Sequence, residues 1–190
     1  MQPSPRPDFR PLLGEPLSID LLNTRWIDST GWHDLLDSVE GLRIWLESPH
    51  VRQELAERPA VADDETLSAI LQVRSALDDV IDVPAPWGEG IVGGLNAVLA
   101  HGRVRRLLLP EGAGTTIEVD APSWLAGWTA AEDFLRLLGE RPERIRPCAN
   151  PECILHFYDI SKNGTRRWCS MAACGNRAKA NRHYARHSQG

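Results

Sequence analysis

The chain has 190 residues, of which 42% are hydrophobic and 25% charged, and its formal net charge is −5. These values are ordinary for a globular protein, and no stretch approaches the roughly 20 apolar residues of a membrane helix, which excludes an integral membrane protein. The proline-rich start, MQPSPRPDFRPLLGEP, lacks the apolar segment of a signal peptide, so we expect a loose arm and a cytoplasmic location.

The first predicted elements are mostly helices. Ser18–Thr24 is an apolar run too short to assign to helix or strand. Apolar residues at helical spacing predict helices over Asp34–Glu47 and Asp63–Val83, and a proline follows each of them. Glu89–Ala100 predicts a shorter helix that two internal glycines weaken.

A hairpin and a last helix complete this part of the chain. Arg103–Leu109 and Thr115–Asp120 are β-like runs separated by the turn sequence PEGAG, so we expect a hairpin. Pro122–Leu138 carries a dense apolar stripe that is typical of a core helix. Gly139–Pro147 contains two prolines, a glycine and alternating charges, which together predict a linker or a tight connection.

The charge changes sign at this linker. From Arg141 to the end there are ten Lys/Arg against three Asp/Glu, a net charge of +7, whereas the preceding part carries −12. We therefore expect one domain over residues 1–142 and a basic module over residues 143–190. The predicted fold class is α+β, with a mainly helical N-terminal domain that holds one β-hairpin and a small C-terminal module.

The four cysteines of the chain all lie in the basic module. Their pattern is C-x4-C-x15-C-x4-C, formed by Cys148, Cys153, Cys169 and Cys174. Two close pairs without a secretory signal favour a metal over disulfides. Four thiolates fill the coordination sphere of zinc, so we expect one structural zinc ion per chain that helps so small a module to fold. Two disulfides, four unrelated thiols and an iron–sulfur centre remain as alternatives.

The segments around the second cysteine pair predict a hairpin and a helix. Aromatic residues flank Lys162-Asn163-Gly164, and Asn-Gly favours a tight hairpin turn. The residues that follow Cys174, GNRAKANRHYARH, predict a helix. Knuckle, hairpin and helix together form a treble-clef-like arrangement. We assign His156, His183 and His187 to the surface and not to the metal.

The module resembles the bacterial CGNR zinc-finger family, whose name is a tetrapeptide that stands here as Cys174-Gly175-Asn176-Arg177. The resemblance extends from Cys148 to Arg186, and it implies that the four cysteines are the zinc ligands. More weakly, Ile19-Asp20-Leu21-Leu22-Asn23-Thr24 resembles the start of the ABATE domain, which is described as a stress-induced transcription regulator. The resemblance therefore implies a DNA-binding regulator.

Basic residues concentrate around the predicted zinc scaffold, as a phosphate-binding surface requires. The candidate nucleic-acid-binding residues are Lys162, Arg166, Arg167, Arg177, Lys179, Arg182 and Arg186. Three of them share a face of the predicted last helix, which suits a major groove. The alternative is that these charges dock the module on the acidic domain or on a partner protein. We also expect Arg177 and Asp159 to brace the module internally.

A polar cluster near the first apolar run suggests an input site. Its residues are Asp20, Asn23, Thr24, Arg25 and Arg74. Together they would line a pocket for a small polar effector. The alternative is a structural role, in which these side chains cap turns and form internal ion pairs.

The predicted function is transcriptional regulation and not catalysis. We find no nucleophile–base motif, phosphate loop or open metal site, so we expect no enzyme. The zinc module would bind DNA, and the N-terminal domain would sense a ligand or dimerise. The alternative function is a protein–protein interaction adaptor whose zinc module docks a partner. Candidate partners are DNA, a small-molecule effector and a second copy of the chain, and no membrane is expected.

Overall fold

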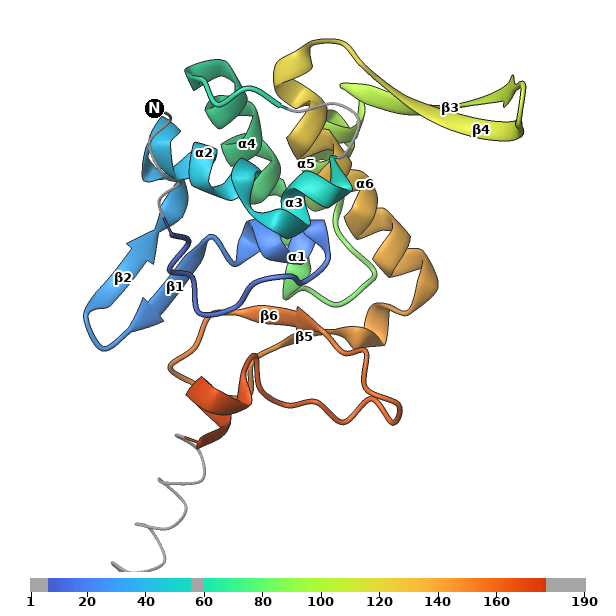
Figure 1. The fold of residues 1–190 in the computed structure, drawn as a ribbon. Helices are drawn as coiled ribbons and strands as arrows, with labels where there is room; N and C mark the ends of the chain where they lie inside the picture. Colours follow the sequence, from blue (N-terminus) through green and yellow to red (C-terminus); the bar gives the residue numbers. More distant parts are fainter. Residues whose placement is uncertain (1–6, 56–59, 177–190) are drawn as a thin grey trace, which may run out of the picture.

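The structure has two parts, a helical body and a small module below it (Figure 1). It is a computed structural model, and it describes residues 7–55 and 60–176. The helices of the body are α1 (Leu17–Leu22), α2 (Val39–Glu47), α3 (Pro49–Glu54), α4 (Asp64–Ile81), α5 (Glu89–Leu99) and α6 (Leu125–Glu140). No helix of the described residues is long and apolar enough to cross a membrane.

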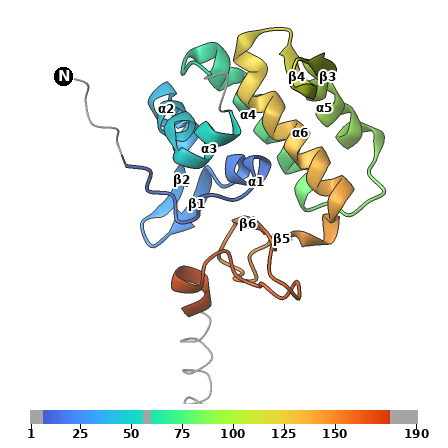
Figure 2. The ribbon, with the colours of Figure 1, turned by 45° about the vertical axis from the view of Figure 1, so that its right-hand side comes forward.

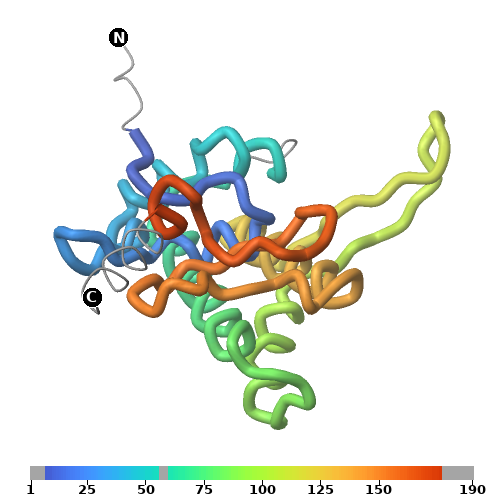
Figure 3. Tube along the Cα trace, turned by 90° about the horizontal axis from the view of Figure 1, so that it is seen from below, coloured from blue at the N-terminus to red at the C-terminus, as the bar shows by residue number. Residues whose placement is uncertain are grey.

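The strands pair as antiparallel hairpins. In the body, β1 (Arg25–Asp28) pairs with β2 (Gly31–Asp34), and β3 (Gly102–Leu109) pairs with β4 (Gly112–Val119). In the module, β5 (Ile145–Pro147) pairs with β6 (His156–Tyr158), and the chain then crosses the underside of the body (Figure 3). Short 3-10 turns occupy Leu35–Asp37, Pro122–Trp124 and Pro142–Arg144. The α+β class is confirmed, although the β1–β2 hairpin was not predicted.

The core of the body forms where α4 and α6 pack side by side (Figure 2). Gly127 of α6 permits this close approach, because a Cβ there would lie 2.8 Å from Val73 Cγ2 of α4. The helix α1 packs on both, and all its residues are buried. Trp45 and Phe134 are fully buried, and burial of such a side chain contributes roughly 1.5–3 kcal/mol.

Side-chain caps set where two of the helices begin. Asp63 accepts a hydrogen bond from the backbone N–H three residues later, at 2.8 Å, and α4 begins directly after it. Ser38 caps α2 in the same way, at 3.3 Å. The predicted helix over Asp63–Val83 is thus confirmed. The helix predicted over Asp34–Glu47 begins later than expected, because its first residues belong to β2 and a 3-10 turn.

The β3–β4 hairpin projects from the body as a two-stranded arm (Figure 1). It confirms the hairpin predicted from Arg103–Leu109 and Thr115–Asp120. The turn is shorter than expected, because β4 already begins at Gly112. The φ angle of Gly112 is 134°, which L side chains rarely adopt, and this explains the glycine. The helices α5 and α6 confirm the helices predicted over Glu89–Ala100 and Pro122–Leu138.

The described part of the proline-rich start and the segment Gly139–Pro147 both belong to the packed fold. Arg10 and Glu15 are buried, so the predicted loose arm is wrong for the described residues of this segment. Gly139–Pro147 is the tight connection and not the linker of the two predicted alternatives, because α6 continues to Glu140 and the strand β5 follows a 3-10 turn. Ile145 of β5 packs against the body core. The body and the module are therefore joined without a free connection, and the domain boundary after residue 142 stays a prediction.

Candidate metal centre

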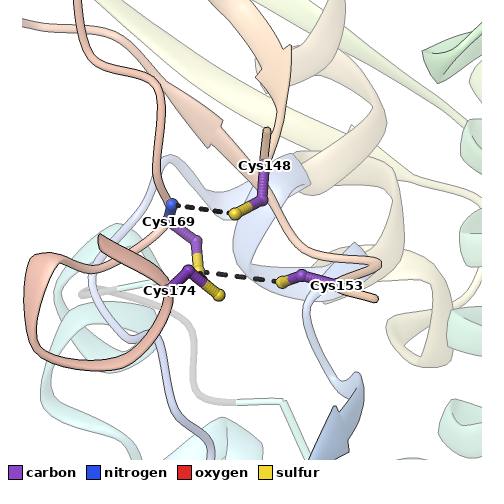
Figure 4. A group of neighbouring side chains, drawn as sticks. All are labelled: Cys148, Cys153, Cys169 and Cys174. Carbon is purple, nitrogen blue, oxygen red and sulfur yellow. Dashed lines mark hydrogen bonds between the residues drawn. The ribbon is translucent and has the colours of Figure 1, made fainter. Parts of the chain in front are cut away.

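The four cysteines of the module bring their sulfur atoms together (Figure 4). All four Sγ atoms lie within 4.8 Å of one another. The Sγ atom of Cys169 lies 3.8 Å from that of Cys153 and 3.6 Å from that of Cys174. Thiolates that bind a tetrahedral zinc ion at about 2.3 Å lie about 3.8 Å from one another. The cluster, completed by Cys148, fits one zinc ion, and its closed ligand set makes that ion structural.

Two tight turns present these sulfur atoms. The strands β5 and β6 enclose the first turn, in which Cys153 N–H donates to Asn150 O at 2.9 Å. The second is the helical turn Met171–Gly175. Most of the helix predicted after Cys174 lies outside the described residues.

Hydrogen-bond donors face the sulfur atoms. Asn150 Nδ2 donates to Cys174 Sγ and Cys169 N–H donates to Cys148 Sγ, each at 3.4 Å. The hydrogen bond with Cys169 lowers the pKa of Cys153 to about 5. The same contact, together with burial, raises the pKa of Cys169. Without a cation one sulfur is charged at the expense of its neighbour, whereas a divalent cation allows all four to be thiolates.

The segment between the cysteine pairs differs from the predicted hairpin. The turn itself is present, since Gly164 N–H donates to Ser161 O at 3.1 Å and the φ angle of Gly164 is 62°. The residues on its two sides do not pair as strands, because Phe157 and Tyr158 in β6 pair with β5 instead. The predicted turn is thus confirmed, and the predicted strand pairing across it is wrong.

Asp159 holds this segment in place. Its buried carboxylate accepts hydrogen bonds from Arg166 N–H at 3.0 Å and from the N–H two residues after Asp159 at 2.9 Å. Burial alone would raise the pKa of Asp159, but these hydrogen bonds and the charge of Arg144 outweigh it and lower the pKa. Its charged neighbours are Arg144 at 3.9 Å and Arg146 at 3.6 Å. The brace predicted from Arg177 lies outside the described residues.

The module is docked on α1 and on the segment that precedes it. Asn23 forms two buried hydrogen bonds with the backbone of His156, donating from Nδ2 to the carbonyl at 2.9 Å and accepting from the N–H at 3.0 Å. Glu15 accepts from Tyr158 N–H at 2.9 Å and from Arg166 Nη2 at 2.8 Å. Side chains of the body therefore supply part of the framework of the module.

His156 was predicted to lie on the surface, and that prediction is wrong. The residue is buried, and its Nε2 lies 2.8 Å from Asp82 Oδ1. It is buried because β6 packs against α1 of the body. The cysteine cluster does not include it. His183 and His187 lie outside the described residues.

A small apolar core joins the two parts. It contains Phe157 and Leu155 of the module together with Trp26 of β1, and it also includes three of the cysteines. Leu12 and Leu35 of the body pack against it. A segment of this size does not bury enough apolar surface to close a core alone, so the body completes it.

The structure places three of the predicted nucleic-acid-binding residues. Lys162 and Arg167 are exposed on the module. Arg166 faces inward, because its Nη2 donates to Cys169 O at 2.7 Å as well as to Glu15. The remaining candidates lie outside the described residues, and they are Arg177, Lys179, Arg182 and Arg186.

Asp20, the first residue of the predicted ligand pocket, belongs to a buried network. Its Oδ1 accepts hydrogen bonds from Arg10 Nη1 at 2.7 Å and from Trp45 Nε1 at 3.0 Å. The side chains of Arg10 and Asp20 are 0% and 1% exposed. Asp20 therefore neutralises a buried cation of its own chain.

The other predicted pocket residues are also engaged within the chain. Thr24 Oγ1 accepts from Arg74 Nη1 at 2.8 Å, and Arg74 makes a bidentate pair with Asp34 at 2.7 Å. Arg25 pairs with Asp78, and the amide of the remaining residue, Asn23, binds the backbone of β6 as described above. These contacts correspond to the structural alternative, in which the cluster builds the fold.

Sequence reasoning missed three residues that support the site. Asn150 was recognisable in principle, since it stands between Cys148 and Cys153 as a polar side chain close to the metal ligands. Glu15 and Asp82 carry no such local signal, because each contacts the module only through the tertiary fold.

The closed four-sulfur site, held on a strand pair and a helical turn, defines a structural zinc finger. The CGNR zinc-finger family matches residues 144–187. The ABATE family, described as "Putative stress-induced transcription regulator", matches residues 15–141. The chain therefore belongs to the ABATE family and carries a CGNR zinc finger. A search of curated proteins finds no match.

We expect Asn23→Ala to loosen the zinc finger from the body. The change leaves the N–H and carbonyl of His156 without their buried partners, which should lower the free energy of unfolding by about 2 kcal/mol. Zinc release to an excess of chelator should become faster, by the factor that corresponds to this loss of free energy. Asn96→Ala, at an exposed position of α5, is the control. A variant that releases zinc at the wild-type rate would show that this pair does not hold the module.

Proposed function

We propose that the protein is a transcriptional regulator that binds DNA through its zinc finger, while the ABATE domain regulates it by sensing a ligand or by dimerising. The observation that carries the proposal is the charge distribution, with a net +7 from residue 141 onward and −12 before it. A basic surface on a rigid scaffold attracts the phosphate backbone and releases its counterions. This is a role in binding and not in catalysis.

Two exposed cations of the module support a phosphate-binding surface. Lys162 lines a hollow of about 310 Å³ with Arg141, Arg144 and Asp159, and the excess of positive charge there suits an anionic oxygen. Arg167 is exposed beside Trp168, with its guanidinium 5.4 Å from the ring centroid. Arg166 is not part of this proposed surface, since it supports the second cysteine pair from inside.

A protein-interaction adaptor is the second candidate function. It is favoured by the docking of the module on the acidic body, where Arg166 already pairs with Glu15. A basic module that binds one acidic surface in its own chain would also bind a similar surface of a partner protein. The two functions differ in whether nucleic acid is bound.

Fluorescence anisotropy of the zinc-loaded protein with duplex DNA and with single-stranded RNA tests the proposal. We expect the double variant Lys162→Ala/Arg167→Ala to weaken duplex binding about tenfold at low salt, and the slope of log K against log salt should fall by about 0.9 for each lost phosphate contact. The triple variant Lys179→Ala/Arg182→Ala/Arg186→Ala should likewise weaken duplex binding and lower the salt dependence.

The control removes the same charge from the body. Arg43→Ala/Arg136→Ala changes exposed arginines of α2 and α6, and it should leave duplex affinity within a factor of two or so. If the wild-type protein binds neither nucleic acid at low salt, the DNA-binding proposal fails and the adaptor function takes its place.

A further inference from the structure

An apolar groove of about 710 Å³ lies where the body meets the zinc finger. Its walls are the end of α4 with the loop that follows, the second half of α6, and the start of the module at β5. Figure 2 shows these segments close together around the lower end of α6. Apolar cavities of roughly 300–1,000 Å³ at such junctions are the usual form of small-molecule sites.

The walls of the groove leave apolar surface in contact with water. Val83 of the loop and Leu135 of α6 both line the groove, and each is 40% exposed. Trp87 is fixed beside them, because its Nε1 donates to Val83 O at 2.7 Å. Clustered apolar side chains that are held open in this way are typical of a surface that a ligand covers.

The chemistry of the ligand follows from the charge of the groove. Asp82 is the one charged side chain among the described residues that line it. Its Oδ1 lies 2.8 Å from His156 Nε2, whereas Oδ2 has no hydrogen-bond partner among the described residues. The side chain is 62% exposed. A carboxylate and an indole ring that line the same groove both attract a cation, the first by its charge and the second through the ring face, and the carboxylate repels an anion.

We propose that this groove binds a hydrophobic organic cation, with its apolar part against Trp87 and Leu135 and its positive charge at Asp82 Oδ2. The ligand would contact the body and the zinc finger at once, since Ile145 and Pro147 line the same groove. Binding itself does not require DNA. Only its use as the regulatory input rests on the proposed function.

Isothermal titration with two ions of nearly the same shape and opposite charge, tetraphenylphosphonium and tetraphenylborate, tests this proposal. The wild-type protein should bind the phosphonium cation at least about tenfold more tightly than the borate anion. Asp82→Asn should weaken binding of the cation about tenfold and should not weaken binding of the anion. Asp79→Asn removes the same charge from an exposed position on α4 and should change neither affinity.

Asp82→Asn also changes the contact with His156. A second variant therefore tests the groove without altering that contact. Leu135→Arg places a cation in the groove from an exposed position of α6, and it should weaken binding of the phosphonium and strengthen that of the borate. Equal affinity of the wild-type protein for both ions, absence of phosphonium binding, or unchanged binding in both variants would each overturn the proposal. Because the titration contains no DNA, its failure leaves the DNA-binding proposal intact.

Discussion

Cys169→Ser should release zinc and unfold the zinc finger. Cys169 is central to the cluster, because its sulfur contacts those of Cys153 and Cys174 and its N–H donates to that of Cys148. Structural zinc supplies about 10–16 kcal/mol of folding free energy in small zinc fingers at neutral pH. Three remaining thiolates with a neutral hydroxyl cannot keep most of that energy.

The helical body should survive this loss. Its main core contains no cysteine, so far-UV circular dichroism should keep most of the helical signal, while Trp26 loses its neighbours and its fluorescence changes. Zinc content per chain, measured by atomic emission, should fall from one towards zero. Ala172→Ser is the matched control, since it adds a serine in the same turn and removes no ligand. A Cys169→Ser protein with a full zinc ion would remove Cys169 from the ligand set.

Asp20→Ala should destabilise the body by about 3–5 kcal/mol. The change leaves the fully buried guanidinium of Arg10 without one of its carboxylates, and it also leaves Trp45 Nε1 without its acceptor. Arg10 keeps its pair with Asp8, so the expected effect combines the loss of a charged buried hydrogen bond with a buried indole N–H that has no acceptor. Urea unfolding followed by circular dichroism measures the difference.

The same variant separates the structural role of Asp20 from the predicted pocket role. Asp37→Asn, at an exposed acidic position, should stay within about 0.5 kcal/mol of the wild type. A loss for Asp20→Ala of similar size to that control would show that the Arg10 pair contributes little. The predicted ligand pocket would then be the better explanation of why these polar side chains gather.

The parts of the fold that were predictable are those with strong local signals. The helix α4 shows an apolar stripe and a capping aspartate, the β3–β4 hairpin has turn residues between β-like runs, and the zinc site follows from the spacing of its cysteines. In each case residues close in sequence determine the structure. The period of the apolar residues, the capping residue or the spacing of the ligands is therefore sufficient to predict the element.

The parts that were not predictable depend on contacts between distant residues. The β1–β2 hairpin buries Trp26 and leaves its other side chains exposed or half-buried, so its sequence lacks the alternation of apolar and polar residues that indicates a strand. The strand β5 looks like a linker, because Pro147 and charged residues surround it, and only its pairing with β6 makes it a strand. The role of Asn23 likewise depends on a partner 133 residues away.

The small core shared by Trp26, Phe157 and the cysteines makes this zinc finger a poor candidate for transplantation. A fragment cut after residue 142 and fused to an unrelated protein would expose Phe157 and Leu155, and it would lose the Asn23 and Glu15 contacts that hold its backbone. A chimaera that works should therefore carry residues 7–35 with the finger. Shortage of zinc would in turn uncover the matching face of the body, which couples the supply of metal to the lifetime of the whole chain.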